Sequence, residues 1–100
     1  MQLHILKTVN PYFEQAWLEN KTFEVRKNDR NFQLNDIVQL KYYTCMNPSN
    51  NLQIAQEQGD HWINHYILGK ITYILNDPMY CKDGYVIFSL EIYDRGSDPT

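Results

Sequence analysis

Period-two alternation of apolar and polar side chains is the feature that most constrains the fold of this chain. It is clearest in residues 85–93, where Val86, Phe88, Leu90 and Ile92 occupy every second position. Alternation of this kind is typical of a β-strand that buries one of its faces. The chain is therefore expected to build a sheet, and the polar turns between its short apolar runs favour mostly antiparallel pairing.

Four more segments predict strands, by alternation or by their content of β-branched and aromatic residues. They are residues 2–8, 22–26, 37–43 and 61–75. Gly69 lies inside the last of them and predicts a bulge or kink.

One helix is predicted over residues 10–20. Asn10 suits the capping position, and Pro11 is tolerated at the first helical position because its missing N–H would be unpaired there. Asn20 is expected to take the left-handed conformation that ends many helices. Three apolar residues at helical spacing form one stripe: Phe13, Ala16 and Trp17. We expect Trp17 to be the main anchor of this helix on the sheet.

These elements predict an α+β, mainly β fold. One hundred residues make one domain, residues 1–100, with a core large enough to fold alone. We expect a small barrel of about five to six strands with one early helix packed against it. Residues 44–60 are polar and predict a long loop, whereas residues 94–100 predict a frayed tail.

Most of the side chains that could bind a ligand or take part in a reaction lie in residues 20–32. Within them, residues 22–26 alternate: Phe23 and Val25 share one face, which would be the buried one, and Glu24 and Arg26 share the other. A polar, basic turn follows before Phe32 returns to the core.

Charge is concentrated in the same place. Residues 21–30 carry a balance of +2, from four basic side chains (Lys21, Arg26, Lys27 and Arg30) against two acidic ones, whereas the rest of the chain carries −5. A positive island on a negative body suggests a local anion site. The alternative is an ordinary solvated turn with surface ion pairs worth ~0–1 kcal/mol each.

Composition excludes several classes of protein. A net charge of −3 argues against a protein that coats DNA, because such proteins are basic throughout. Cys45 and Cys81 form neither a disulfide framework nor a C-x-x-C pair, so we expect reduced thiols in a cytoplasmic protein. Residues 1–7 lack the features of a signal peptide, and no run approaches the ~18–20 apolar residues that span a bilayer. His61 and His65 stand four apart, a metal-ligand spacing only on a helix, and their segment predicts a strand. We expect no metal and no cofactor.

Several motifs together resemble a known family. The chain reads Asn-Lys-Thr-Phe-Glu-Val-Arg at residues 20–26, followed by Asn-Asp-Arg at 28–30, Ile-Thr-Tyr-Ile-Leu at 71–75 and Lys-Asp-Gly-Tyr-Val at 82–86. This pattern resembles the ASCH domains of the PUA-like superfamily, and more narrowly a small subfamily of unknown function from bacteria and their phages. The resemblance covers roughly residues 3–92.

The resemblance implies a PUA-like β-barrel with a cleft between helix and barrel, lined by the strand of the first motif. It also implies RNA binding or RNA-linked metabolism. Lys21, Glu24 and Arg26 match the motif of the family, and Asn20 stands where glycine is usual.

Some ASCH-like proteins similar to this one hydrolyse an amide on a modified cytidine. Their chemistry uses a lysine in the motif, a threonine three residues later and a separate glutamate. Lys21 matches the lysine, but position 24 is glutamate, and only Asp77 and Asp83, both turn residues, stand near the place of the separate glutamate. This departure weakens the enzyme hypothesis.

The first functional hypothesis is a non-catalytic module that binds RNA or a nucleotide-like ligand. Arg26, Lys27 and Arg30 would hold phosphate, and Glu24, in a cleft with Lys21, would accept hydrogen bonds from a base edge. Three aromatic side chains are candidates for stacking on a base: Tyr42, Tyr43 and Trp62.

The second hypothesis is a hydrolase of an acyl-modified nucleoside, with Lys21 as base or nucleophile and Glu24 as the proton shuttle. In an ideal strand these two side chains point to opposite faces, so they converge only if Lys21 lies in the turn before the strand. The third hypothesis is a phage-type adaptor that binds a host protein. The identity of the ligand and the oligomeric state stay open at this point.

Overall fold

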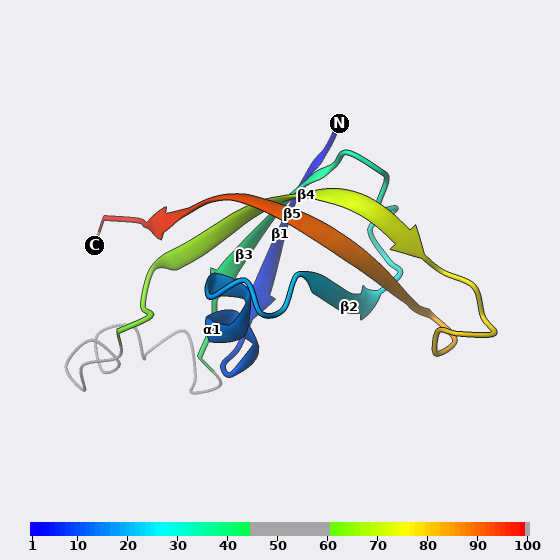
Figure 1. The fold of residues 1–100 in the computed structure, drawn as a ribbon, viewed down its shortest axis with the longest axis horizontal. Coiled ribbons are helices and arrows are strands. Elements are labelled where there is room, and N and C mark those ends of the chain that lie inside the picture. The colour runs from blue at the N-terminus through cyan, green and yellow to red at the C-terminus, as the bar shows by residue number, and fades with distance from the viewer. Residues whose placement is uncertain (45–60, 100) are drawn as a thin grey trace.

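A five-stranded sheet, curled into a half-barrel around one short helix, makes up the described part of the chain (Figure 1). The computed structural model describes residues 1–44 and 61–99. Its elements are β1 (Leu3–Thr8), α1 (Tyr12–Trp17), β2 (Phe23–Lys27), β3 (Ile37–Tyr42), β4 (His65–Leu75) and β5 (Tyr85–Ser97). The expectation of a small, mainly β, barrel-like fold with one early helix is confirmed.

The strand order puts β1 and β2 at opposite ends of the hydrogen-bonded sheet. The order is β1-β3-β4-β5-β2; β1 runs parallel to β3, and the other neighbours are antiparallel. Both β1 and β2 are therefore edge strands, and no strand pairing joins them within the described residues. Figure 1 shows how the curvature of the sheet nevertheless brings β1 and β2 to the same side as α1.

The core fills the concave side of the sheet. Alternate residues of β5 are buried there, as the period-two pattern predicts. Opposite them, α1 contributes Phe13 and Ala16, which are 0% and 1% exposed. The remaining members of the core cluster come from the other strands and the turn after β2: Leu6, Phe32, Val38, Leu40, Ile67 and Ile71.

The helix is shorter than predicted, and its anchor is a different residue. It spans Tyr12–Trp17, and beyond it the N–H groups of Asn20 and Lys21 fold back onto the Gln15 carbonyl oxygen at 2.9 and 3.1 Å. The left-handed residue is Glu19, with φ 60°, and not Asn20.

Phe13, not Trp17, anchors the helix in the core. Trp17 is the last helical residue and is only partly buried, because it lies at the rim, where the Arg95 guanidinium covers its ring at 5.9 Å. The prediction that Trp17 is the main anchor is therefore wrong.

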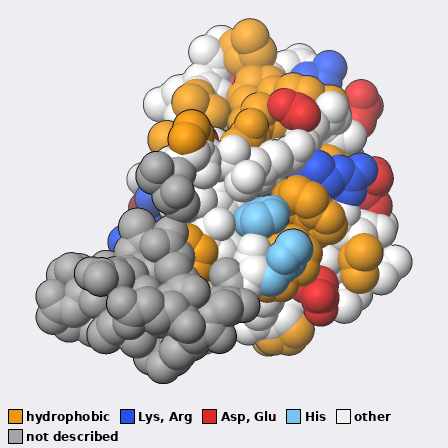
Figure 2. Space-filling model, turned by 90° about the vertical axis from the view of Figure 1, so that its left-hand side faces the viewer, with side chains coloured by type: hydrophobic (Ala, Val, Ile, Leu, Met, Phe, Trp, Pro, Cys, Tyr) orange, Lys and Arg blue, Asp and Glu red, His pale blue; other side chains and the backbone are white. Residues whose placement is uncertain are grey.

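Indole and imidazole rings pack against one another at the rim where Trp17 lies. The Trp17 ring lies 5.2 Å from that of His65, and His61 lies 5.1 Å from His65 and 4.9 Å from Trp62. Figure 2 shows histidine side chains among hydrophobic ones on the face that it presents. The two histidines thus pack against indole rings, as structural residues do. In the described ranges no group of three or more His, Cys, Asp or Glu is placed to hold a metal ion.

The longest strands differ from their predicted limits. β4 begins at His65 rather than at residue 61, and β5 extends to Ser97, which pairs with His65. The frayed tail predicted from residue 94 is therefore wrong as far as Ser97, because residues 94–97 complete the ladder with β4. Gly69 lies at a register shift between β4 and β5, but the residue without a partner there is Tyr93 of β5, so the irregularity predicted at Gly69 lies on the neighbouring strand. The predicted long loop falls almost wholly on residues 45–60, which lie outside the described part of the chain, as does Cys45.

Two further observations concern composition. Cys81 is a buried free thiol whose Sγ donates to the Leu75 carbonyl oxygen at 3.1 Å.

Among the described residues no helix is long and apolar enough to cross a membrane.

A buried polar contact fixes the first residues of β1 to the turn before β3. His4 and Asp36 are each 3% exposed, and His4 Nε2 donates to Asp36 Oδ2 at 2.8 Å. The backbone N–H groups of Gln2 and Gln33 also donate to this carboxylate, at 3.0 and 3.1 Å. Burial by itself would raise the pKa of Asp36, but the hydrogen bonds from His4, Gln2 and Gln33 outweigh it, so the pKa is lowered from its ordinary value.

We expect Asp36 to contribute to stability at neutral pH and to lose that contribution in acid. A carboxyl group with a lowered pKa in the folded protein stabilises it above the pKa of the unfolded chain, about 4, and this stabilisation disappears as the pH falls through the folded-state pKa. Asp36→Asn should lower the free energy of unfolding by about 1–3 kcal/mol at neutral pH. Below about pH 4 the gap between variant and wild type should narrow.

Urea denaturation followed by circular dichroism across this pH range measures the effect. Asp83→Asn, which removes an exposed carboxylate, is the control for the change in net charge. A gap between Asp36→Asn and wild type that stays constant through the acid range would contradict the assignment.

Candidate functional site between the two sheet edges

The two faces of β2 are the reverse of the prediction. Phe23 and Val25 are 48% and 52% exposed, whereas Glu24 is buried, with 3% of the residue exposed. The register with β5 is the cause. Glu24 pairs with Phe88, whose side chain lies in the core, and paired residues on antiparallel strands share a face. The charged face of this strand is therefore its inner face.

Two cations compensate the buried carboxylate of Glu24. Lys21 Nζ donates to Glu24 Oε2 and also to the Phe23 carbonyl oxygen at 2.7 Å. On the other side Arg26 Nε donates to Glu24 Oε1 at 3.0 Å, and Arg26 Nη2 lies 2.8 Å from the same oxygen. Lys21 lies in the turn before β2, which is the position that allows its side chain to converge with Glu24.

The Arg26 guanidinium also reaches across to β1. Its Nη1 donates to the Lys7 carbonyl oxygen and its Nη2 to Thr8 Oγ1, both at 3.0 Å. Two residues earlier on the same edge of β1, the Ile5 carbonyl oxygen accepts a hydrogen bond from Arg30 Nη1 at 3.0 Å. Arginine side chains thus connect the two edge strands of the half-barrel.

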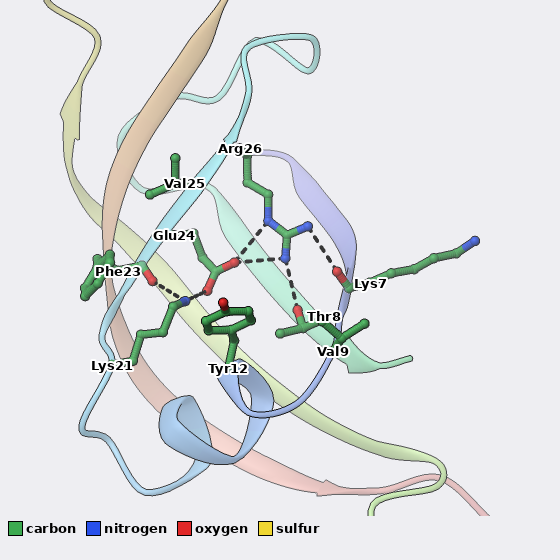
Figure 3. Close-up of a pocket in the computed structure, with 9 residues that line it drawn as sticks. All are labelled: Lys7, Thr8, Val9, Tyr12, Lys21, Phe23, Glu24, Val25 and Arg26. Atoms are coloured by element: carbon green, nitrogen blue, oxygen red, sulfur yellow. Dashed lines mark hydrogen bonds and ion pairs between the residues drawn. The ribbon is translucent and has the colours of Figure 1, made fainter. Parts of the chain in front are cut away.

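A pocket of about 400 Å³ opens where these groups meet, and we call it the β1–β2 pocket. Figure 3 shows Lys21 and Arg26 on either side of Glu24, with the side chain of Lys7 extended away from them. The pocket is lined by the end of β1 and the residue after it, the start of α1, the turn before β2 and the first four residues of β2: Lys7, Thr8, Val9, Tyr12, Lys21, Phe23, Glu24, Val25 and Arg26.

The pocket combines positive charge with apolar surface. Its ionic cluster holds two cations and one anion, and the side chains of Lys21 and Arg26 keep exposures of 18% and 24% against 4% for Glu24. The ring of Phe23 and that of Tyr12, which is 55% exposed, are also open to solvent. Such an arrangement suits a ligand that has an anionic group and a planar apolar part.

The structure brings the predicted site residues together in two adjoining places. Lys21, Glu24 and Arg26 line the β1–β2 pocket, whereas Lys27 and Arg30 line a second pocket, of about 210 Å³, to which Arg26 also contributes. The aromatic side chains proposed for stacking line neither pocket: Tyr42, Tyr43 and Trp62.

Sequence reasoning missed the aromatic and hydroxyl groups of the site. Tyr12 and Thr8 belong to other elements, and nothing in their spacing relates them to β2. Phe23 was placed on the buried face of its strand, because alternation alone does not show which face is turned to solvent.

We expect Glu24 to be important for stability as well as for the site. Glu24→Gln keeps the shape of the side chain but leaves two cations without their anion, so it should lower the free energy of unfolding by about 2–3 kcal/mol. This is less than for a fully buried pair, because Lys21 and Arg26 partly reach water. Chemical denaturation measures the change, and Glu91→Gln, on the exposed face of β5, is the matched control. A loss no larger than that of the control would show that the cluster does not stabilise the fold.

Comparison with known proteins gives the family but no activity. A comparison with curated proteins found no match. A family model described as a domain of unknown function, DUF3850, matches residues 3–90, which include every strand up to the middle of β5, the helix and both pockets. The chain is therefore a member of the DUF3850 family.

Proposed function

We propose that the β1–β2 pocket binds a nucleotide-like ligand, either free or as one unit of an RNA, without catalysing a reaction on it. The observation that carries this proposal is the pair of cations, Lys21 and Arg26, that one buried carboxylate holds at the wall of an open pocket. Because Glu24 fixes both side chains before a ligand arrives, binding costs little side-chain entropy there.

The donors that remain on the two cations suit a phosphate group. Arginine has five N–H donors, and within the described residues Arg26 donates three hydrogen bonds, to Glu24, Lys7 and Thr8, while its Nη2 also forms an ion pair with Glu24. Lys21 uses two of its three, on Glu24 and Phe23. At least one N–H on each cation is left for a ligand, and the cluster has an excess charge of +1. Charge-assisted hydrogen bonds to phosphate oxygens are among the stronger ones in proteins.

The apolar part of the pocket suits a base. Phe23 and Tyr12 offer aromatic faces on which a base can stack, an interaction that tolerates different bases. In this proposal Glu24 holds the cations instead of reading a base edge, because both of its oxygens already accept hydrogen bonds. The resemblance to ASCH domains supports the same ligand class, and a PUA-like barrel and a cytoplasmic location belong to the proposal.

A titration of the isotope-labelled protein, followed by amide chemical shifts, tests this function. The ligands are cytidine, cytidine 5′-monophosphate and a short structured RNA. We expect the monophosphate to shift amides around Thr8, Tyr12 and residues 21–26, and cytidine to bind more weakly. The salt dependence should be shallow, because few phosphates are held.

The matched variants are Lys21→Gln and Lys70→Gln, which remove the same charge. Lys70 lies on β4 between buried Gly69 and Ile71, so by the alternation of the strand it points away from the core. Lys21→Gln should weaken binding of the monophosphate about tenfold and Lys70→Gln should leave it unchanged. If none of the ligands shifts any amide, the proposal fails and the adaptor hypothesis, with a protein partner, takes its place.

Hydrolysis of an acyl-modified nucleoside is the second candidate, and one observation favours it. Lys21 Nζ and the Glu24 carboxylate are in contact, so the geometric objection that they point to opposite faces does not apply. Against it, the acceptors around Nζ satisfy an ammonium group, which is not a nucleophile.

This candidate predicts that the protein converts an acylated cytidine and water into cytidine and the free acid. Lys21→Ala should abolish the turnover, which chromatography of the products measures. Turnover that survives Lys21→Ala would eliminate Lys21 as the catalytic group, and no turnover by the wild-type protein would leave binding as the function.

A further inference from the structure

We propose that the second pocket is a phosphate site, so that the ligand of this protein carries two phosphates, one on each side of Arg26. This inference rests on the proposed function of the β1–β2 pocket and extends it. The second pocket measures about 210 Å³ and is lined by Leu6, Arg26, Lys27, Asp29, Arg30 and Phe32. Because Arg26 lines both pockets, one ligand can occupy the two together.

The charges of the second pocket favour an anion. Three cations line it against one carboxylate, that of Asp29. Lys27 is exposed and forms no ion pair with any residue of the described ranges, and the same holds for Asp29. The ammonium group of Lys27 is thus free to meet a ligand, unlike that of Lys21.

Arg30 is positioned to hold such an anion by a pair of hydrogen bonds. Only its Nη1 is engaged within the described part of the chain, on the Ile5 carbonyl oxygen. That bond fixes the guanidinium at the edge of β1 and leaves the remaining donors for a ligand. A planar guanidinium with neighbouring free N–H groups matches the geometry of phosphate oxygens, and a lysine beside it adds a point charge.

The inner wall of the pocket strengthens these interactions. Leu6 and Phe32 belong to the core cluster and are 3% and 6% exposed. Their apolar surface lies directly beside the cations, and a low-dielectric wall raises the local field of charges that face a pocket. A phosphate is therefore attracted more strongly to this pocket than to an equally charged turn that is open to water.

Two kinds of molecule carry phosphates at neighbouring positions of one nucleotide unit. One is a strand of RNA, in which successive phosphates flank each ribose, and the other is a small nucleotide with two phosphate groups. The shared chemistry is a nucleoside with a phosphate on each side of its sugar. Cytidine 3′,5′-bisphosphate represents the small molecule and a 5′-phosphorylated dinucleotide of cytidine represents the strand.

The test compares the affinities of these two probes with that of cytidine 5′-monophosphate, for the wild-type protein and for Lys27→Gln. Lys27 makes no side-chain bond within the described residues, so this substitution should not disturb the fold. We expect at least one of the two-phosphate probes to bind about tenfold more tightly than the monophosphate. Lys27→Gln should remove that gain and leave the affinity for the monophosphate within about twofold.

Two further variants sharpen the test. Arg30→Lys keeps the charge but removes the paired donors, and it should reduce the same gain. Lys70→Gln removes a charge elsewhere and should preserve it. A gain seen with the dinucleotide alone identifies RNA as the source of the second phosphate, and a gain with the bisphosphate alone identifies a small nucleotide.

The two proposals fail in different ways. If the monophosphate binds but neither two-phosphate probe binds more tightly than it does, the second pocket is not a phosphate site, and the proposed function survives. An equal loss of affinity for all ligands in Lys27→Gln would also overturn the inference. Lys27 would then attract every anionic ligand by its charge alone, without contacting a second phosphate. If no probe binds at all, both proposals fall together.

Discussion

The contact between Arg26 and the far edge of the sheet is the interaction on which the rest of the structure depends. Within the described ranges the half-barrel has two edge strands, β1 and β2, each with backbone groups that no neighbouring strand pairs. Arg26 and Arg30 donate to the carbonyl oxygens of Lys7 and Ile5, so guanidinium groups replace the missing strand ladder. Glu24 keeps Arg26 in the orientation that this requires.

The position of the ionic cluster explains why the pockets form where they do. Side chains that connect two strands at a distance leave space between the strands, whereas backbone hydrogen bonding would close it. The Arg26 side chain lines both pockets. A buried carboxylate with its cations contributes little net stability compared with apolar packing. Within the fold, the role of the cluster is therefore to connect the two edge strands beside the pocket, rather than to add net stability to the core.

Much of the fold could be predicted from local pattern. The alternation in β5 and the early helix each depend on nearest neighbours in sequence, and the structure confirms them. The limits of the helix and the anchoring role of Trp17 were wrong, because the rim of the barrel decides which residues of a short helix are covered. The prediction of a frayed tail was wrong for residues 94–97. Ser97 pairs with His65, a partner more than thirty residues away in the sequence, which local pattern does not reveal.

The sequence by itself determined the class of fold and the place of the charge. A positive island within residues 21–30 on an acidic chain is a property of composition, and it coincides with both pockets. Only the tertiary structure decided which face of β2 is buried. Alternation specifies that two faces differ, but the pairing of Glu24 with Phe88 assigns them, and it turned the charged face inward. The register of two strands is a long-range property, and the energy of a buried charge depends on partners that only folding assembles.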